Sequence, residues 1–142
     1  MRNNVRLSKA QIDQSALALL TFLGQNRHDR TFEYPFGYSY PTNCCESVSL
    51  ILTYLLEEKY NLKTVEIVKG KKRLKYEFHY WVRVGDLHYD LTAHQFPRRK
   101  PIIGALAHPL FFKFPDWEIE KGRDFVERDQ VIEAYRHGVI PF

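Results

Sequence analysis

Apolar residues recur at helical spacing near the N-terminus and predict a first helix. Its buried face is expected to consist of Ile12, Ala16, Leu19, Leu20 and Leu23. Ser8 and Gln11 stand three residues apart at its start, as in a capping box, and Leu7 with Ile12 occupies the positions of a hydrophobic staple. Gly24 is placed to end this helix, which we interpret as structural.

A second helical stripe begins beside the two cysteines of the chain, Cys44 and Cys45. Its apolar positions are Val48, Ile51, Leu52 and Leu55, and Leu50, Tyr54 and Leu56 widen the stripe until the helix is mostly buried. Asn43 is placed to cap the helix, with Glu46 three residues later, and Asn61 is placed to end it. Both cysteines are therefore expected in its first turn.

The middle of the chain predicts antiparallel strands. Residues 64–69 form a short strand, and residues 75–84 alternate in polarity before a two-residue turn at 85–86 and a returning strand over 87–92. The alternation places Tyr76, Phe78, Tyr80, Val82 and Val84 on one face, and Glu77, His79, Trp81 and Arg83 on the other. A last short helix is expected over residues 124–137.

An aromatic segment over residues 27–42 precedes the second helix. Its alternating aromatic residues are Phe32, Tyr34, Phe36, Tyr38 and Tyr40, and Pro35, Gly37 and Pro41 interrupt the run. This composition predicts an edge strand or an ordered loop. The segment either packs into the core or forms a wall of a substrate cleft.

Length and composition indicate one globular unit. We expect a single α+β domain over residues 1–142, with 44% hydrophobic and 27% charged residues. No stretch approaches the roughly 18 apolar residues that cross a bilayer, and the N-terminus has no apolar signal core. These features predict no membrane contact.

The net charge of +4 comes from one short segment. Residues 69–75 carry five of the 21 basic residues and no acidic one, so the rest of the chain has 16 basic against 17 acidic residues. A shorter basic run follows at residues 98–100. Each run is interpreted as a solvated surface or as a contact for an acidic partner, with nucleic acid the least favoured partner.

The adjacent cysteines narrow the chemistry of the chain. Neighbouring residues are too close for ordinary disulfide geometry, and two sulfurs without a nearby second Cys or His cluster do not favour structural zinc. The remaining readings are a reactive thiol and a small buried hydrophobic residue. A helix start favours the first reading, because unpaired N–H groups there stabilise a thiolate.

A base and its partner follow from the predicted hairpin. With the turn at residues 85–86, paired positions have numbers that sum to 171, so His79 and Asp90 become diagonal neighbours on one face. A carboxylate at that distance can fix the tautomer of an imidazole and stabilise its charged form. The remaining histidines, which are interpreted as packed or solvated, are His28, His88, His94, His108 and His137.

Three motifs in this order resemble the transglutaminase-like and papain-like cysteine-enzyme superfamily. They are residues 43–49 (NCCESVS), 79–81 (HYW) and 89–96 (YDLTAHQF). The resemblance covers about residues 39–96 and is closest to compact bacterial and phage members, including domains of secreted toxins. It implies a papain-like core in which the helix of the nucleophile packs on a small antiparallel sheet.

The resemblance also implies roles for individual residues. Cys45 matches the nucleophile, with Cys44 as the second choice, while His79 matches the base and Asp90 its orienting partner. Trp81 and Asn43 are expected to bind substrate, although Trp81 can instead pack over the histidine. No glutamine stands six residues before either cysteine, so the second oxyanion donor stays unassigned, with Asn43 as a weak candidate.

The implied function is cysteine-dependent acyl transfer on a peptide or side-chain amide, as in a protease, glutamine deamidase or transglutaminase. We expect a protein or peptide substrate, no cofactor and no metal. The alternative is a non-catalytic binding module that uses the aromatic segment and the basic hairpin. Free adjacent thiols favour the cytoplasm, or delivery into the cytoplasm of a target cell if the chain is a toxin domain, which would then have an immunity or carrier protein.

Overall fold

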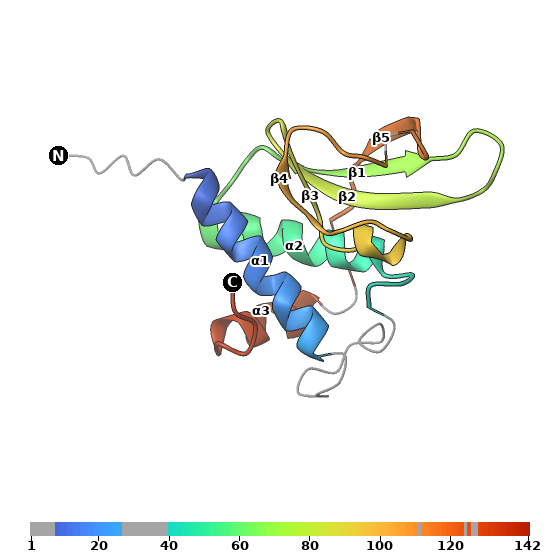
Figure 1. The fold of residues 1–142 in the computed structure, drawn as a ribbon. Coiled ribbons are helices and arrows are strands. Elements are labelled where there is room, and N and C mark those ends of the chain that lie inside the picture. The colour runs from blue at the N-terminus through green and yellow to red at the C-terminus, as the bar shows by residue number, and fades with distance from the viewer. Residues whose placement is uncertain (1–7, 27–39, 111, 124, 126–127) are drawn as a thin grey trace.

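The computed structural model of this chain describes residues 8–26, 40–110, 112–123, 125 and 128–142. Within these ranges the chain forms an α+β structure, which confirms the predicted class (Figure 1). None of the helices found there is long and apolar enough to cross a membrane.

Helices and strands alternate irregularly along the described chain. The helices are α1 (Lys9–Asn26), α2 (Cys45–Tyr60), the 3-10 helix η1 (Ala93–Gln95) and α3 (Arg128–Arg136). The strands are β1 (Val65–Lys71), β2 (Phe78–Val84), β3 (Leu87–Asp90), β4 (Ile102–Ala105) and β5 (Asp116–Glu120). The strands form one sheet in the order β4-β3-β2-β1-β5, with every neighbouring pair antiparallel.

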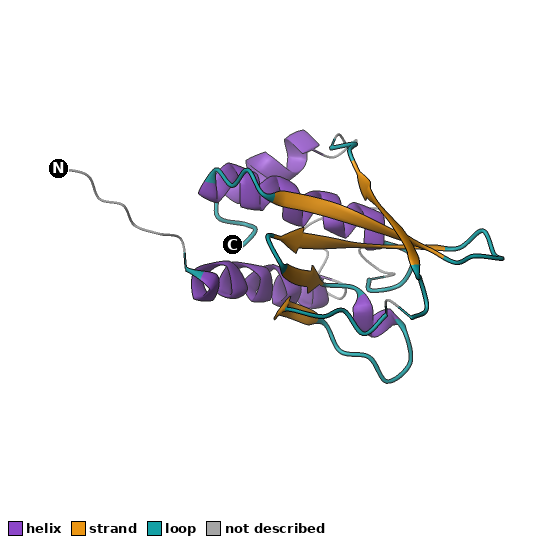
Figure 2. Ribbon diagram, turned by 90° about the horizontal axis from the view of Figure 1, so that it is seen from above, coloured by secondary structure: helices purple, strands orange, loops and turns teal. Residues whose placement is uncertain are grey.

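The α-helices lie on one side of this sheet (Figures 1 and 2). The main core fills the space between the helices and the sheet, and α2 runs across the sheet with eight buried residues. Ile12, Ala16, Leu19 and Leu23 of α1 are buried there as predicted, and Leu20 is partly buried. Val82, Val84 and Tyr89 face them from the sheet.

The start of α1 is the predicted capping box. The Ser8 N–H donates to Gln11 Oε1 over 2.9 Å, and the Gln11 N–H donates to Ser8 Oγ over 3.2 Å. The predicted end of α1 is wrong, because the helix continues through Gly24 to Asn26. Leu7, of the proposed staple, lies outside the described residues.

The start of α2 differs by one residue from the predicted start. Cys45 is the first helical residue and Cys44 is the N-cap, without a side-chain capping bond. The predicted cap at Asn43 is therefore wrong, since this exposed residue adopts a left-handed φ of 55° before the helix begins. Asn61 ends α2 as predicted, in the left-handed region with φ 51°.

The predicted hairpin register is confirmed. Val84 pairs with Leu87 and Val82 with Tyr89, so paired numbers sum to 171. The two hairpin strands are shorter than predicted, since β2 begins at Phe78 and β3 ends at Asp90, and the side chain of Tyr76 is 94% exposed in the loop before β2. The strand predicted over residues 64–69 is instead longer, spanning Val65–Lys71. Of the last helix predicted over residues 124–137, residues 124, 126 and 127 lie outside the described part, Phe125 is not helical, and α3 spans Arg128–Arg136.

The other face of β2 is also buried. Residues from η1 to the loop before β5 form a second apolar cluster there, made of Ala93, Ile102, Leu110 and Phe114 with Phe96 and Ala105 packed against it. His79 and Trp81 project into this side of the sheet, where Phe96 and Phe114 contact the His79 ring at centroid distances of 5.0 and 5.6 Å. His79 and Trp81 of the predicted polar face are thus buried, while the Arg83 side chain is 25% exposed.

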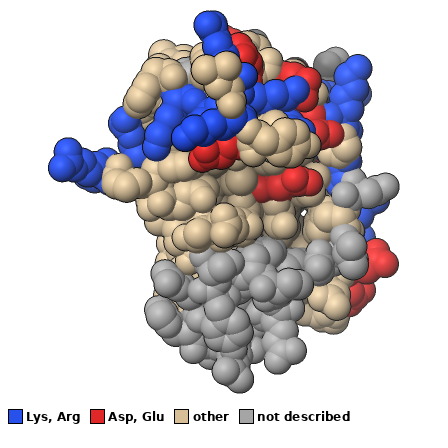
Figure 3. Space-filling model, turned by 90° about the vertical axis from the view of Figure 1, so that its right-hand side faces the viewer, with Lys and Arg blue, Asp and Glu red and all other residues tan. Residues whose placement is uncertain are grey.

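Ion pairs neutralise much of the basic run at residues 69–75. Lys71 pairs with Glu118 at 2.9 Å, and Lys72 pairs with Glu77 at 2.8 Å. Acidic side chains accordingly lie among the basic ones on this face (Figure 3). Of the aromatic segment, residues 27–39 lie outside the described part, while Tyr40 is buried and donates its hydroxyl hydrogen to the carbonyl of Leu91 over 2.5 Å.

Gly70 provides a test of the close packing over β2. It pairs with His79 in register, and a Cβ at this position would lie 2.8 Å from Phe114 Cβ and 3.0 Å from the Trp81 ring. We expect Gly70→Ala to lower the free energy of unfolding by about 1–3 kcal/mol because backbone and ring must move apart.

The matched control is Gly24→Ala inside α1, where a Cβ meets no described atom within 4 Å beyond its own helix. That variant should gain about 0.5–1 kcal/mol, because alanine favours the helical backbone. Urea unfolding of both variants measures the difference, and equal stability of the two would contradict this account of Gly70.

Candidate active site

The two cysteines have different environments although they are adjacent. Cys44 is 2% exposed, and burial followed by the neighbouring Cys45 raises the pKa of its thiol to about 12. Cys45 is half-buried at the first position of α2, where the helix N–H groups stabilise negative charge. Cys45 is therefore the better placed of the two to react as a thiolate.

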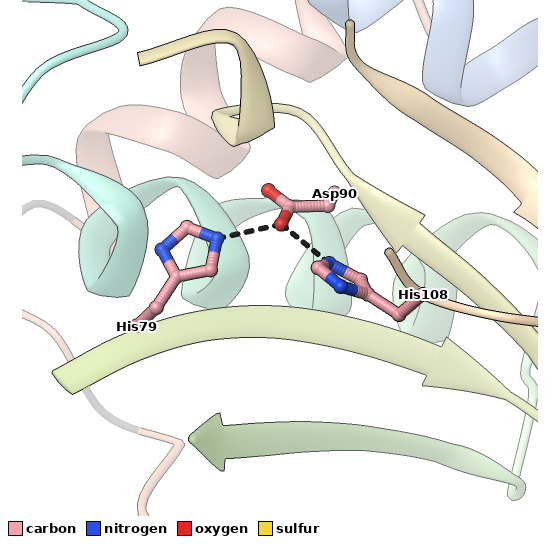
Figure 4. Close-up of side chains that lie close together, drawn as sticks. All are labelled: His79, Asp90 and His108. Atoms are coloured by element: carbon pink, nitrogen blue, oxygen red, sulfur yellow. Dashed lines mark hydrogen bonds and ion pairs between the residues drawn. The ribbon is translucent and has the colours of Figure 1, made fainter. Parts of the chain in front are cut away.

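His79 and Asp90 meet as the hairpin register predicts. His79 Nε2 lies 2.6 Å from Asp90 Oδ2, and both side chains are buried (Figure 4). His79 comes from the start of β2 and Asp90 from the end of β3, so the bond joins two neighbouring strands on the face opposite Val82. Their proximity is confirmed, and their catalytic roles stay predictions.

Asp90 accepts four hydrogen bonds. Its Oδ2 also receives His108 Nε2 at 2.8 Å, and its Oδ1 receives the N–H of Thr92 at 3.0 Å and the Thr92 hydroxyl at 3.3 Å. Four donors match the acceptor capacity of an ionised carboxylate. Burial favours the neutral acid, but the charge of His79 and the bonds from both rings outweigh it and hold the pKa of Asp90 well below its usual range.

His108 was interpreted from the sequence as packed or solvated, and its position at Asp90 was missed. The Leu110 N–H donates to His108 Nδ1 over 3.0 Å, so Nδ1 carries no proton and the hydrogen of the neutral ring is on Nε2. His108 thus donates to the carboxylate. It lies in the loop after β4, and no period or spacing in the sequence relates that loop to Asp90.

The second ring nitrogen of His79, Nδ1, takes no part in the hydrogen bonds to Asp90. Nδ1 is buried without a hydrogen-bond partner among the described residues, and it points away from Asp90 (Figure 4). The Cys45 thiol interacts with this ring. Burial disfavours the charged ring, but Asp90 and then Cys45 outweigh it and raise the pKa of His79 to about 9. At neutral pH the ring is therefore cationic.

The expectation that Trp81 binds substrate is wrong for this conformation, because the residue has 0% exposure. Its ring stacks on His108 at a centroid distance of 4.2 Å, and its Nε1–H donates to His88 Nδ1 over 3.1 Å. Trp81 therefore packs within the site, in line with the alternative expectation that it packs rather than binds substrate. Asn43 is exposed two residues before Cys45, and its contact with substrate stays a prediction.

His79, Asp90 and His108 also offer three donor atoms within 4.8 Å of one another, which raises the question of a metal. A histidine that binds a metal through one nitrogen normally donates the N–H of the other. His108 Nδ1 instead accepts a hydrogen bond from the Leu110 N–H. A metal on Nε2 would require a proton on Nδ1, and that proton would then face the Leu110 N–H. The spacings of 2.6 and 2.8 Å are those of shared protons, shorter than the roughly 3.3 Å between tetrahedral zinc ligands. The residues fit a hydrogen-bonded network better than a metal.

A recess of about 60 Å³ lies close to Cys45. Its walls are Glu46, Leu50, Ile67, Tyr80, Glu120 and Gly122. Cys45 packs against the small apolar cluster formed by Leu50, Ile67 and Tyr80. Cys45 thus contacts the apolar residues of the recess, whose walls also contain the carboxylates of Glu46 and Glu120.

No family model, no curated protein and no solved structure matches this chain. The geometry of the site is therefore the basis for a functional proposal.

Labelling with iodoacetamide at pH 6.5 tests which thiol is activated. We expect Cys45→Ala to remove rapid labelling and Cys44→Ala to keep it within about twofold, because only Cys45 combines access with the helix start and His79. His79→Ala should slow labelling at least tenfold or so, through loss of the cation that stabilises the thiolate. Rapid labelling that follows Cys44 would contradict this assignment.

The pH dependence of stability tests the His79–Asp90 bond. The pKa of His79 is raised from 6.5 to about 9, so the stability from this ring is complete below pH 6.5 and is lost as the pH rises to 9. We expect the advantage of the wild type over Asp90→Asn in free energy of unfolding to shrink by about 2 kcal/mol across that interval. Glu118→Gln, which breaks an exposed pair with Lys71, is the control and should show a constant difference.

Proposed function

We propose that this protein catalyses cysteine-dependent acyl transfer at a peptide or side-chain amide. The observation that carries the proposal is the arrangement of His79, which bonds Asp90 through Nε2, leaves Nδ1 without a hydrogen-bond partner among the described residues, and interacts electrostatically with Cys45. Nucleophile, base and orienting carboxylate then stand in the functional order of a cysteine triad.

The first half of the reaction forms a thioester. In the reactive pair the proton of Cys45 is already on Nδ1 of the cationic His79 ring, and the Cys45 thiolate attacks the amide carbonyl carbon, forming a C–S bond. The C–N bond then breaks, the amine departs with the proton from His79, and the acyl group stays on sulfur. Asp90 holds the charged ring throughout, through the bond to Nε2.

The second half releases the acyl group to a second nucleophile. Water, deprotonated by His79, gives a carboxylic acid, and a primary amine gives a new amide. In both cases the thiol is restored. Peptide hydrolysis, glutamine deamidation and crosslinking therefore share the same residues and differ in the acceptor that reaches the thioester. We favour hydrolysis of a protein or peptide amide.

The start of α2 offers donors for the negative oxygen of the intermediate. The first bond of the helix joins the Val48 N–H to the carbonyl of Cys44 over 2.9 Å, so the N–H groups of Cys45, Glu46 and Ser47 precede the helical ladder. The Cys45 N–H is the donor closest in sequence to the thiol. It fits the role of an oxyanion donor, and Asn43 remains the candidate for a second.

The architecture supports a papain-like or transglutaminase-like core. Its helix begins at the nucleophile and packs on an antiparallel sheet, and consecutive strands supply His79 and Asp90. The resemblance in the sequence implies the same order. The two free thiols support action in a reducing compartment.

The decisive experiment incubates the protein with a defined peptide mixture and a biotinylated primary amine, followed by mass spectrometry. Cleaved peptides would indicate a protease, one-dalton gains at glutamine a deamidase, and amine adducts a transglutaminase. We expect one of these products with wild type and with Cys44→Ala, and none with Cys45→Ala or His79→Ala. Absence of all products, together with labelling no faster than that of free cysteine, would replace this proposal with the binding module.

A further inference from the structure

We propose that His108 is a positioning residue of this site, which donates its Nε2–H to Asp90 so that the carboxylate stays ionised and His79 keeps Nε2 on Asp90 and Nδ1 outside that bond. This inference rests on the proposed function. It assigns a fourth residue to the network, from a loop outside the segment that resembles known enzymes.

The direction of each hydrogen bond follows from the Leu110 N–H. Because that group donates to His108 Nδ1, His108 is a neutral ring with its single proton on Nε2. That proton is directed at Asp90 Oδ2, the oxygen that His79 also uses. Both rings therefore donate to one oxygen, and the two donors stabilise its negative charge.

The second donor matters for the state of His79. A carboxylate that is 1% exposed and poorly supplied with donors would take a proton, and His79 would then lose its anionic partner. The hydrogen bonds from His108 and Thr92 stabilise the ionised form of Asp90. The Nε2 hydrogen therefore stays on His79. The remaining nitrogen, Nδ1, is then the only position of the ring that can exchange a proton with the thiol.

His108 is itself held in place on several sides. Its ring stacks on Trp81 at an interplanar angle of 25°, and it is 3% exposed. The backbone bond from Leu110 fixes the rotation of the ring. The loop after β4 thus presents one proton to Asp90 in a fixed direction, as a positioning residue requires.

Two substitutions separate this role from simple anchoring of the loop. In His108→Asn, the amide oxygen can accept the Leu110 N–H in place of Nδ1, but no donor reaches Asp90. In His108→Gln, the longer amide can donate to Asp90 in place of Nε2, but the Leu110 N–H loses its partner. Each variant keeps one of the two hydrogen bonds of His108 and loses the other, so each serves as the control for the other.

The readout is the rate of iodoacetamide labelling of Cys45 between pH 4 and 9. We expect His108→Asn to label about tenfold more slowly at pH 6, and the acid limb of its profile to move to higher pH, because Asp90 is protonated earlier without this donor. His108→Gln should stay within about threefold of wild type. The charge of Asp90 also acts on Tyr40 and His94. Neither residue is substituted in the two variants.

A fast His108→Asn variant beside a slow His108→Gln variant would overturn the proposal and leave His108 as a loop anchor. If both variants fail to fold, nitrogen-15 NMR of the imidazoles in the wild-type protein decides the question. A neutral His108 with the proton on Nε2 at pH 7 is expected, and a proton on Nδ1 would overturn the proposal. Failure of the proposed function can be told apart from failure of this proposal, because wild type and His79→Ala would then be labelled equally slowly.

Discussion

The site depends on one buried negative charge. Asp90 lies among apolar residues at the end of β3, and a carboxylate in such a position is unfavourable unless donors surround it. The structure supplies donors from three places: His79 on the neighbouring strand, Thr92 just after the carboxylate, and His108 from a distant loop. The orientation and charge of His79 follow from that arrangement.

Local rules in the sequence were enough to predict part of this network. The two-residue turn after Val84 fixes the pairing of the hairpin, and pairing alone brings His79 beside Asp90. His108 could not be found in this way, because its position depends on how the loop after β4 folds back over the sheet. The same loop covers Trp81, so a residue expected in a cleft became part of the interior. Tertiary packing decided both cases.

The choice between the two cysteines shows how finely a helix boundary controls chemistry. A cap at Asn43 would have placed both thiols inside the first turn, where the sequence could rank them only by resemblance. The helix instead begins at Cys45, and the preceding Cys44 turns into the core. Element boundaries are the least certain part of a prediction from pattern, since the competing caps differ by little free energy. Here a shift of one residue separates a half-buried sulfur at the helix start from one packed in the core.

The apolar cluster on the second face of β2 determines how far the chain can be truncated. Residues 39–96 contain the thiol, the imidazole and the carboxylate, yet His108, Leu110 and Phe114 come later in the chain. An excised segment would keep Cys45, His79 and Asp90 while exposing the His79 ring to water on the side that Phe114 now covers. The part of the chain that maintains the geometry of these residues is thus longer than the stretch that contains the sequence motifs, and it extends beyond β4.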